Sequence, residues 1–362
     1  MKKKLFFVAG LFLIALSGFE LGPISPRPKR IIFLIGDGMG LSQVTASLYA
    51  QKNKSVFEQF PFTGLITTHS ASDLVTDSGA GGTALACGCK TYNGAIGLDA
   101  HKKRCTSLLE IADSLGLATG IAVNCSVTHA TPASFVAHAS SRKEMEFIAT
   151  WYIDNSIDYI VGGGEKYFQN RTTLPERNLL EELRSQNYFI SLNAHDSFPP
   201  VPDPNRPFLW LNAKDDPPSA LEGRSYLPEA VKRGCTYLYQ RGAEKGFFLM
   251  VEGSQIDWAG HGNDGTRLLA EMLDFEKTVE AALQFAQQDG ETLVVVTADH
   301  ETGGLGIVQG STMDSLELKF VSNGHTASMV PVFAFGPGAD LFSGIYDNTQ
   351  IYYRIKKAMG WE

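Results

Sequence analysis

The sequence contains acidic and imidazole side chains at spacings that suit metal binding. Asp257 and His261 lie four residues apart, so on a helix they share one face and can hold one cation, although such a pair is more often a surface interaction. Glu252 lies five residues before Asp257 and is expected to serve a neighbouring ion. Asp299 and His300 are adjacent and precede two glycines, which permit the turn that both side chains would need to coordinate metal. Imidazole with carboxylate suits zinc, and an oxygen-only set suits magnesium.

A serine precedes a segment of small residues that we expect to be a tightly packed helix. Asp77 and Ser78 come directly before Gly79–Ala86, which places Ser78 in the first helical turn. Free N–H groups and the helix dipole favour an anion there, and a serine so placed becomes a nucleophile if its pKa is lowered. The alternative is that Ser78 only caps the helix, and this segment alone favours the cap.

Three further residues are ambiguous when each is taken alone. Asp37 lies between glycines after an apolar run, where open α/β sheets bind ligands, but a turn aspartate that caps the next helix has the same pattern. His325 lies in a predicted loop, and a hydrogen-bonded loop histidine is the simpler interpretation. Arg142 can present two donors to phosphate oxygens, or it can be a solvated helix arginine.

The elements that would position these residues are those of a doubly wound α/β fold with a mostly parallel sheet. Continuous apolar runs are typical of strands that are covered on both faces, and helical patterns lie between several of them. Polar residues follow four of the strands, so they would gather at one edge of the sheet. We predict strands at Arg30–Gly36, Thr119–Cys125, Asp158–Val161, Gly246–Val251, Thr292–Thr297 and Val330–Phe335, helices at Ser107–Leu115 and Thr266–Gln288, and a long surface excursion at Ser197–Arg224.

Composition limits the class of protein and its location. The chain has 362 residues, 44% hydrophobic content and a net charge of −8, so it has ample core for one large domain or two small ones, and nucleic acid is excluded as an expected partner. Three lysines precede an apolar run that is too short to span a membrane. We therefore predict a secretory signal peptide at Met1–Ser17, a leader at Gly18–Lys29, one catalytic domain at residues 30–362, no stable membrane anchor, and a periplasmic or secreted product.

Five cysteines remain after this signal segment. An odd number in an oxidising compartment leaves at least one free thiol. Cys105–Cys125 is a candidate disulfide, and Cys87 and Cys89 would be buried, inert thiols of the small-residue helix, with Cys235 unassigned. The sequence alone does not settle this pairing.

Together these features resemble the alkaline phosphatase family, from Arg30 to about Met359. Each motif is modest evidence alone, but all six occur in the order that the family shows. The motifs are Gly36-Asp37-Gly38-Met39-Gly40, Val75-Thr76-Asp77-Ser78, His129-Ala130-Thr131-Pro132 with Arg142 eleven positions past Thr131, the set Glu252, Asp257 and His261, Thr297-Ala298-Asp299-His300, and Gly324-His325-Thr326.

The resemblance implies metal-dependent hydrolysis of phosphate monoesters at alkaline pH, through a phosphoserine on Ser78. Arg142 would bind phosphate and Asp77 would orient it. Two zinc ions and one magnesium ion are implied. Their implied ligands are Asp257, His261 and His325 for the first zinc, Asp37, Asp299 and His300 for the second, and Asp37, Thr131 and Glu252 for magnesium.

Three departures from the family pattern bear on these implications. Position 129 is His where bacterial members often carry Asp, so zinc can compete with magnesium at the third site. Position 258 is Trp where other members use Lys or His near phosphate, so we expect phosphate to be held less tightly. Only 24 residues separate His300 from His325, so the crown insertion is small, which weakens the inference of a homodimer.

Two other interpretations account for part of the same pattern. Related phosphodiesterases, sulfatases and metal-dependent mutases share part of the ligand set, but diesterases usually carry a threonine nucleophile, and Asp77-Ser78-Gly79 is the wrong context for formylglycine. A periplasmic zinc-binding or phosphate-binding protein would not need Ser78, so its function would survive Ser78→Ala.

Overall fold

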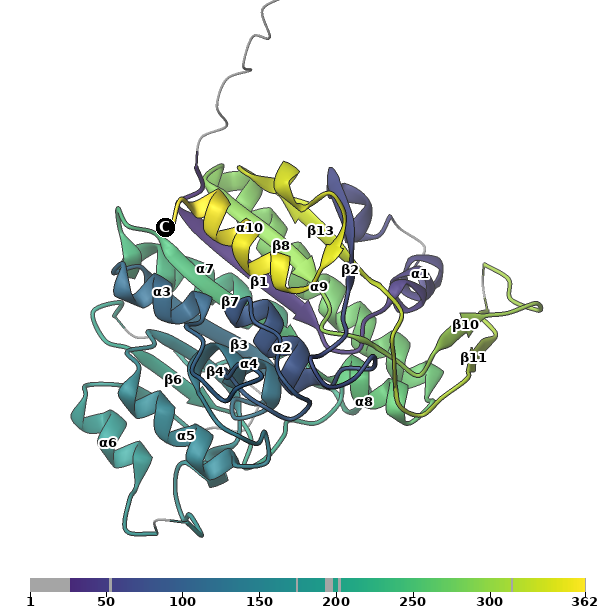
Figure 1. Cartoon of the computed structure of the whole chain (residues 1–362). Coiled ribbons are helices and arrows are strands. Elements are labelled where there is room, and N and C mark those ends of the chain that lie inside the picture. The colour runs from purple at the N-terminus through teal and green to yellow at the C-terminus, as the bar shows by residue number, and fades with distance from the viewer. Residues whose placement is uncertain are drawn as a thin grey trace, which may run out of the picture.

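Figure 1 shows a computed structural model that describes residues 27–51, 54–173, 175–192, 198–200, 203–313 and 315–361. A ten-stranded sheet runs through its centre in the order β14-β2-β13-β8-β1-β7-β3-β4-β6-β5. All pairings are parallel except those of β13, which runs against both β2 and β8. The strands are β1 Arg30–Gly36, β2 Phe62–Thr67, β3 Ala118–Ser126, β4 Tyr159–Gly163, β5 Phe189–Ser191, β6 Phe208–Leu211, β7 Phe247–Gly253, β8 Thr292–Thr297, β13 Val330–Phe335 and β14 Gly344–Asp347.

Helices cover both faces of this sheet (Figure 1). α7 and α9 pack on one face, against β3, β7 and β8, while α3 and α4 pack on the other face and α2 lies over α4. The two predicted helices are α3 and α9. The helices are α1 Leu41–Ala50, α2 Ser78–Cys87, α3 Leu108–Ser114, α4 Ala130–Val136, α5 Met145–Asp154, α6 Leu179–Ser185, α7 Tyr226–Gly242, α8 Gln255–His261, α9 Gly265–Asp289 and α10 Thr349–Met359, with 3-10 turns at Val56–Gln59, Glu165–Tyr167, Ala220–Glu222 and Ala339–Phe342.

All six predicted strands belong to the sheet, which confirms the doubly wound α/β fold. Every residue of β1, β7 and β8 is buried, as expected for apolar runs between two helical layers. The predicted excursion at Ser197–Arg224 is wrong for its centre, because Phe208–Leu211 is the buried strand β6. Its four apolar residues are flanked by Pro, Asp and Asn, and those residues dominated the local composition.

The short stretch between His300 and His325 forms two small sheets beside the central one. β9 (Glu301–Thr302) pairs with β12 (His325–Thr326), and β10 (Leu305–Ile307) pairs with β11 (Leu318–Phe320). The β10–β11 hairpin projects from the body of the molecule (Figure 1). The β9–β12 pair brings the segments of the two predicted histidine ligands together.

The predicted disulfide between Cys105 and Cys125 is wrong, because Cys105 is bonded to Cys89. Cys125 lies in the buried strand β3, whereas Cys89 and Cys105 lie on the chain that leaves α2 and approaches α3. Cys89 is also not part of the helix, since Gly88 ends α2 in a left-handed conformation with φ of 66°. Cys87, Cys125 and Cys235 are free and buried.

The predicted signal peptide and most of the predicted leader lie outside the described residues. Among the residues that are described, no helix combines the length and the apolar character that crossing a bilayer requires.

Candidate metal centre and active site

Four neighbouring strands bring the predicted ligands to one edge of the sheet. Asp37 follows β1, Glu252 lies near the end of β7, and Asp299 follows β8. Thr131 lies at the start of α4, just after β3. Because β8, β1, β7 and β3 are adjacent and parallel, their carboxyl ends lie at the same edge of the sheet. The predicted gathering of polar side chains at this edge is therefore present in the structure.

Close packing of the backbone makes this gathering possible. Gly38 has φ of 75°, and a Cβ atom there would lie 2.8 Å from the Cα of Asp257 and 2.8 Å from the Oγ1 of Thr302. Any larger residue would push the α8 and β9 segments away from β1. The glycine after Asp37 thus lets three separate segments meet.

One candidate metal group consists of Asp257, His261 and His325. The Nε2 atoms of the two histidines lie 3.1 Å apart, and each is about as close to Asp257: 3.4 Å for His261 and 3.5 Å for His325. The Nδ1 atoms donate to the carbonyls of Asn323 at 2.7 Å and Thr76 at 2.8 Å. These bonds leave the Nε2 lone pairs facing the cluster, which is how histidine ligands of zinc are usually oriented.

A second candidate group consists of Asp37, Asp257 and His300. The Nε2 of His300 lies 3.5 Å from Asp37 and 3.2 Å from Asp299, so the predicted ligand Asp299 joins the same cluster. One carboxylate oxygen of Asp37 and one of Asp299 are buried without a hydrogen-bond partner. Buried, unpartnered carboxylate oxygens beside an imidazole are costly unless a cation neutralises them. These residues therefore fit a divalent ion.

The electrostatics of the cluster point the same way. Burial and three neighbouring carboxylates raise the pKa of Asp37 well above its usual value. Burial, with the charge of Asp257, raises the pKa of Asp299 to about 6, and burial raises the pKa of Glu252 to about 7. Burial also lowers the pKa of His300 to about 3, which keeps its imidazole neutral and able to donate a lone pair. Burial and their mutual repulsion thus disfavour the ionised forms of these carboxyls, and a bound cation would reverse that preference.

Ser78 lies at the margin of the second group. It is the first residue of α2, and its Oγ is 3.2 Å from the Nε2 of His300. The helix cap is Asp77, whose Oδ1 accepts from the N–H of Ala80 at 3.0 Å. The interpretation of Ser78 as only a cap is therefore wrong, because the neighbouring aspartate performs that function and leaves the hydroxyl facing the site.

Arg142 lies in the turn between α4 and α5 rather than on a helix surface, and its side chain is 31% exposed. Its Nη1 donates to the Oδ2 of Asp77 at 3.0 Å. Asp77 is therefore placed to orient Arg142, as the resemblance implies. The contact also brings the guanidinium close to Ser78, the residue that follows Asp77.

The third predicted site lies beyond Asp37. Thr131 lies beside the Glu252 carboxylate, and its Oγ1 is buried without a hydrogen-bond partner. His129 stands at the edge, where its Nε2 lies 3.3 Å from Asp216 and its ring 5.6 Å from that of Trp258. The structure thus brings together all the predicted ligands, with His129 and Trp258 at the rim.

Two contributors were not found from the sequence. Asp216 holds His129 and also accepts from the N–H of Ser126 at 2.8 Å. Thr302 donates to Asp257 at 2.5 Å, and its hydroxyl lies 3.2 Å from the Nδ1 of His300. Thr302 lies two residues past the motif that ends at His300, and its hydroxyl is the only sequence feature that could have indicated this contact. Asp216 lay in the stretch that was interpreted as a surface excursion.

A doubly wound sheet with a buried carboxylate and imidazole cluster beside a helix-terminal serine defines a metal-dependent hydrolase. Residues 28–318 match the family model for alkaline phosphatase. Alkaline phosphatase 3 of Bacillus subtilis (strain 168) is 32% identical, with 99% of this chain and 97% of that protein covered. Alkaline phosphatase of Escherichia coli (strain K12) is 33% identical, with 93% and 87% covered.

Solved structures give the same result. The alkaline phosphatase from the Antarctic bacterium TAB5 is 38% identical and has a TM-score of 0.87. The match covers 93% of this chain and 100% of that chain. A variant of that enzyme with one histidine changed to aspartate is described with magnesium bound in its M3 site. The chain belongs to the alkaline phosphatase family, and it is a hydrolase of phosphate monoesters. The related diesterases, sulfatases and mutases, and a non-enzymatic binding protein, are thereby set aside.

Proposed function

We propose that the chain hydrolyses phosphate monoesters through a covalent phosphoserine on Ser78. The observation that carries this proposal is the position of the Ser78 hydroxyl, 3.2 Å from His300 and beside the unpartnered oxygens of Asp37 and Asp299. In the first step the Ser78 Oγ, having given its proton to water, attacks phosphorus in line, and the bond from phosphorus to the leaving alkoxide breaks, which then takes a proton from water. In the second step water attacks phosphorus from the vacated side, the bond between phosphorus and the Ser78 Oγ breaks, Ser78 is protonated again, and inorganic phosphate leaves.

The chain's own residues bind and orient the phosphate in both steps. Arg142 donates to two non-bridging oxygens, and Asp77 fixes the direction of its guanidinium. The positive end of the α2 dipole, at Ser78, would favour the phosphate charge at the same place. Trp258 at the rim adds no charge, so phosphate release is expected to be less hindered than it would be beside a lysine.

We propose two zinc ions and one magnesium ion as cofactors. Asp257, His261 and His325 would hold the first zinc, with Asp257 shared toward the second group. When bound, these ions lower the pKa of hydroxyl groups and water, and they neutralise charge on the phosphate and the leaving oxygen. The remaining ligands would be Asp37, Asp299 and His300 for the second zinc, and Asp37, Thr131 and Glu252 for magnesium.

Zinc is the alternative to magnesium as the ion of the third site. His129 offers nitrogen at the rim, and nitrogen ligands favour zinc over magnesium. The magnesium-bound variant of the TAB5 enzyme supports a third site in this family that accepts magnesium. Metal analysis of the purified protein, before and after dialysis against each ion, tests the assignment.

We also propose a secreted or periplasmic protein with its signal peptide at Met1–Ser17, one catalytic domain at residues 30–362, and no nucleic acid recognition. A homodimer fits the exposed apolar side chains Leu41, Val321 and Ile345, the last of them on the edge strand β14. Light scattering of the wild type and Ile345→Lys tests the dimer, and N-terminal sequencing of the exported protein tests the cleavage site.

The central experiment measures turnover of p-nitrophenyl phosphate from neutral to strongly alkaline pH, before and after chelation, with zinc and magnesium restored separately. A matched diester of the same phenol is expected to react far more slowly. Acid quenching followed by peptide mass spectrometry should find phosphate on Ser78, and Ser78→Ala should lack it. Undiminished hydrolysis by fully demetallated protein, or by Ser78→Ala, would refute the proposal.

A further inference from the structure

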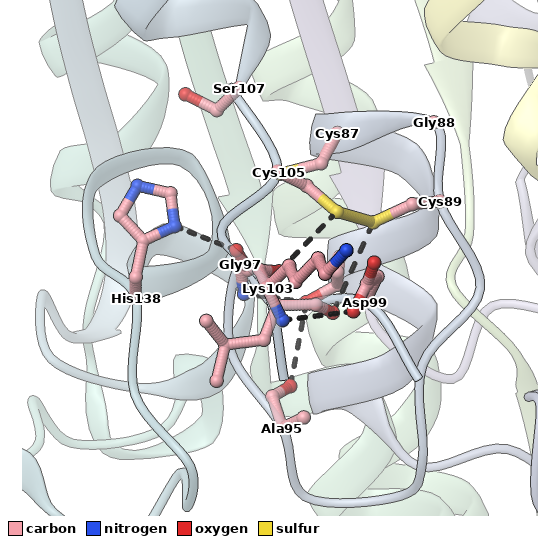
Figure 2. Close-up of a disulfide and its surroundings, with 12 residues drawn as sticks. Cys87, Gly88, Cys89, Ala95, Gly97, Asp99, Lys103, Cys105, Ser107 and His138 are labelled. Carbon is pink, nitrogen blue, oxygen red and sulfur yellow. Dashed lines mark hydrogen bonds between the residues drawn. A yellow bond between two sulfur atoms is a disulfide. The ribbon is translucent and has the colours of Figure 1, made fainter. Parts of the chain in front are cut away.

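The chain that follows α2 returns to the beginning of the same helix and is closed by the disulfide. Gly88 turns the chain out of α2, and the Cys89–Cys105 bond joins the two ends of the segment 89–105, here called the 89–105 loop (Figure 2). Within this loop Gly94 reaches the start of α2, where it contacts Asp77. The 89–105 loop therefore spans the helix that carries Ser78, from its last turn to its first.

Gly94 connects the two groups that are expected to bind phosphate. Its N–H donates to the Oδ1 of Asp77 at 2.9 Å, and its carbonyl accepts from the backbone N–H of Arg142 at 2.7 Å. The other oxygen of Asp77 accepts from the Arg142 guanidinium at 3.0 Å. A shift of this one residue would therefore move both the backbone of Arg142 and the carboxylate that aims its side chain.

Asn93 fixes the backbone that leads into Ser78. Its Oδ1 accepts from the N–H of Asp77 at 3.2 Å, and its Nδ2 donates to the carbonyl of Val75 at 3.0 Å. Its own N–H donates to the Oγ of Ser72 at 3.1 Å. Asn93 and Gly94 thus hold the segment 72–77 from outside the helix.

The second limb of the loop is tied to the segment that carries Arg142. Ile96 and Ala139 exchange two backbone hydrogen bonds of 3.0 Å each. The carbonyl of Gly97 lies 2.6 Å from the Nδ1 of His138 and accepts from the N–H of Cys105 at 2.9 Å (Figure 2). The cysteine that closes the loop is therefore hydrogen-bonded to the same glycine that contacts the Arg142 segment.

We propose that Asn93, Gly94 and the Cys89–Cys105 disulfide are positioning elements for phosphate, which hold Asp77 and Arg142 in register with Ser78. This inference rests on the proposed function, in which Arg142 binds phosphate. None of the three touches the reacting atoms. They act through Asp77 and Arg142, so their loss weakens phosphate binding and leaves the nucleophile itself intact.

The test compares Cys89→Ser/Cys105→Ser and Asn93→Ala, each in the wild type and in an Arg142→Ala background. The readouts are the inhibition constant of inorganic phosphate and the KM and kcat for p-nitrophenyl phosphate, with zinc and magnesium present and well below the melting temperature. In the wild type we expect the inhibition constant and KM to rise about three- to tenfold, with a smaller change in kcat, because a charged hydrogen bond is partly lost. With Arg142 absent the same changes should alter inhibition less than about twofold.

A matched control is Lys103→Ala in the same loop. Lys103 is exposed, and its contacts with Asp99 use only its backbone N–H and carbonyl, so phosphate inhibition should not change. If the double cysteine variant fails to fold, Asn93→Ala keeps the disulfide and carries the test. Wild-type protein reduced with a phosphine provides a further comparison that needs no mutation.

The outcomes separate this inference from the proposed function. If Arg142→Ala itself leaves phosphate inhibition unchanged, the phosphate-binding role of Arg142 in the proposed function fails, and the positioning inference fails with it. If Arg142→Ala weakens inhibition but Asn93→Ala and disulfide removal do not, only the positioning inference fails. Equal fold-changes in both Arg142 backgrounds would also overturn it, because the loop would then act independently of Arg142. A lower melting temperature with unchanged KM would show a purely stabilising loop.

Discussion

Replacing Thr302 with valine should weaken zinc binding without removing any ligand. The Thr302 hydroxyl donates to the Oδ1 of Asp257 at 2.5 Å, and the side chain is fully buried. Asp257 belongs to both candidate metal groups, so its orientation matters to two ions. Valine has nearly the same shape but lacks the hydroxyl, so it removes the hydrogen bond to Asp257 and the contact with His300 and leaves the carboxylate free to rotate.

The size of the effect follows from the charge on the acceptor. A hydrogen bond to a charged group contributes about 1.5–3 kcal/mol, and 1.4 kcal/mol corresponds to a factor of ten, so zinc affinity should fall roughly 10- to 100-fold. Loss of a contact that orients a ligand costs a similar factor in other metal sites. Competition with a coloured chelator measures the affinity directly, and activity at limiting zinc should fall in parallel.

Thr297→Val is the matched control. Thr297 is also buried, and its hydroxyl donates at 2.9 Å to the neutral carbonyl of Pro331 on a neighbouring strand. This variant should lower the free energy of unfolding by about 1 kcal/mol and leave zinc affinity unchanged. Equal zinc affinity in Thr302→Val and the wild type would refute the reasoning, as would equal losses in the two variants.

Three other changes have defined outcomes. Trp258→Lys should add a positive charge near bound phosphate and lower the phosphate inhibition constant several-fold; an unchanged constant in steady-state kinetics would count against this. Arg224→Met should reduce the free energy of unfolding in urea by roughly 3–5 kcal/mol, since it strips the buried carboxylates of Glu271 and Asp274 of their cation. Burial opposes ionisation of Glu110, but its hydrogen bonds prevail and lower its pKa in the folded protein below the usual 4.5. The stability that its charged form contributes is therefore fully present above pH 4.5 and is lost as the pH falls through the lowered pKa. Glu110→Gln should therefore be less stable than wild type at neutral pH, and thermal melts should converge in acid.

The central strands were predictable because their physics is local. A strand between two helical layers must be apolar on both faces, so Arg30–Gly36 and Thr292–Thr297 are recognisable from composition alone and match β1 and β8 residue for residue. The edge strand β14 and its neighbour β2 are partly exposed, and β6 has only four residues. Their residue patterns are too short or too mixed to be told apart from loops. These segments are strands because they pair with neighbouring strands of the sheet.

The cysteine pairing could not be obtained in the same way. Cys105 lies 16 residues from Cys89 and 20 from Cys125, so chain separation favours neither partner. The choice depends on the left-handed turn at Gly88, which takes Cys89 out of the helix toward Cys105. The burial of Cys125 in β3 then removes the alternative.

The metal ligands could be named from the sequence, but their division into sites depends on three-dimensional orientation. The spacing of Asp257 and His261 on α8 predicts that they share one ion, and the two are indeed adjacent. The spacing does not show that one oxygen of Asp257 faces His261 while the other faces His325 and Thr302. Asp257 also lies close enough to Asp37 and His300 to share an ion with them, which makes it a member of both groups. A carboxylate shared in this way couples the two ions, so loss of either should weaken binding of the other.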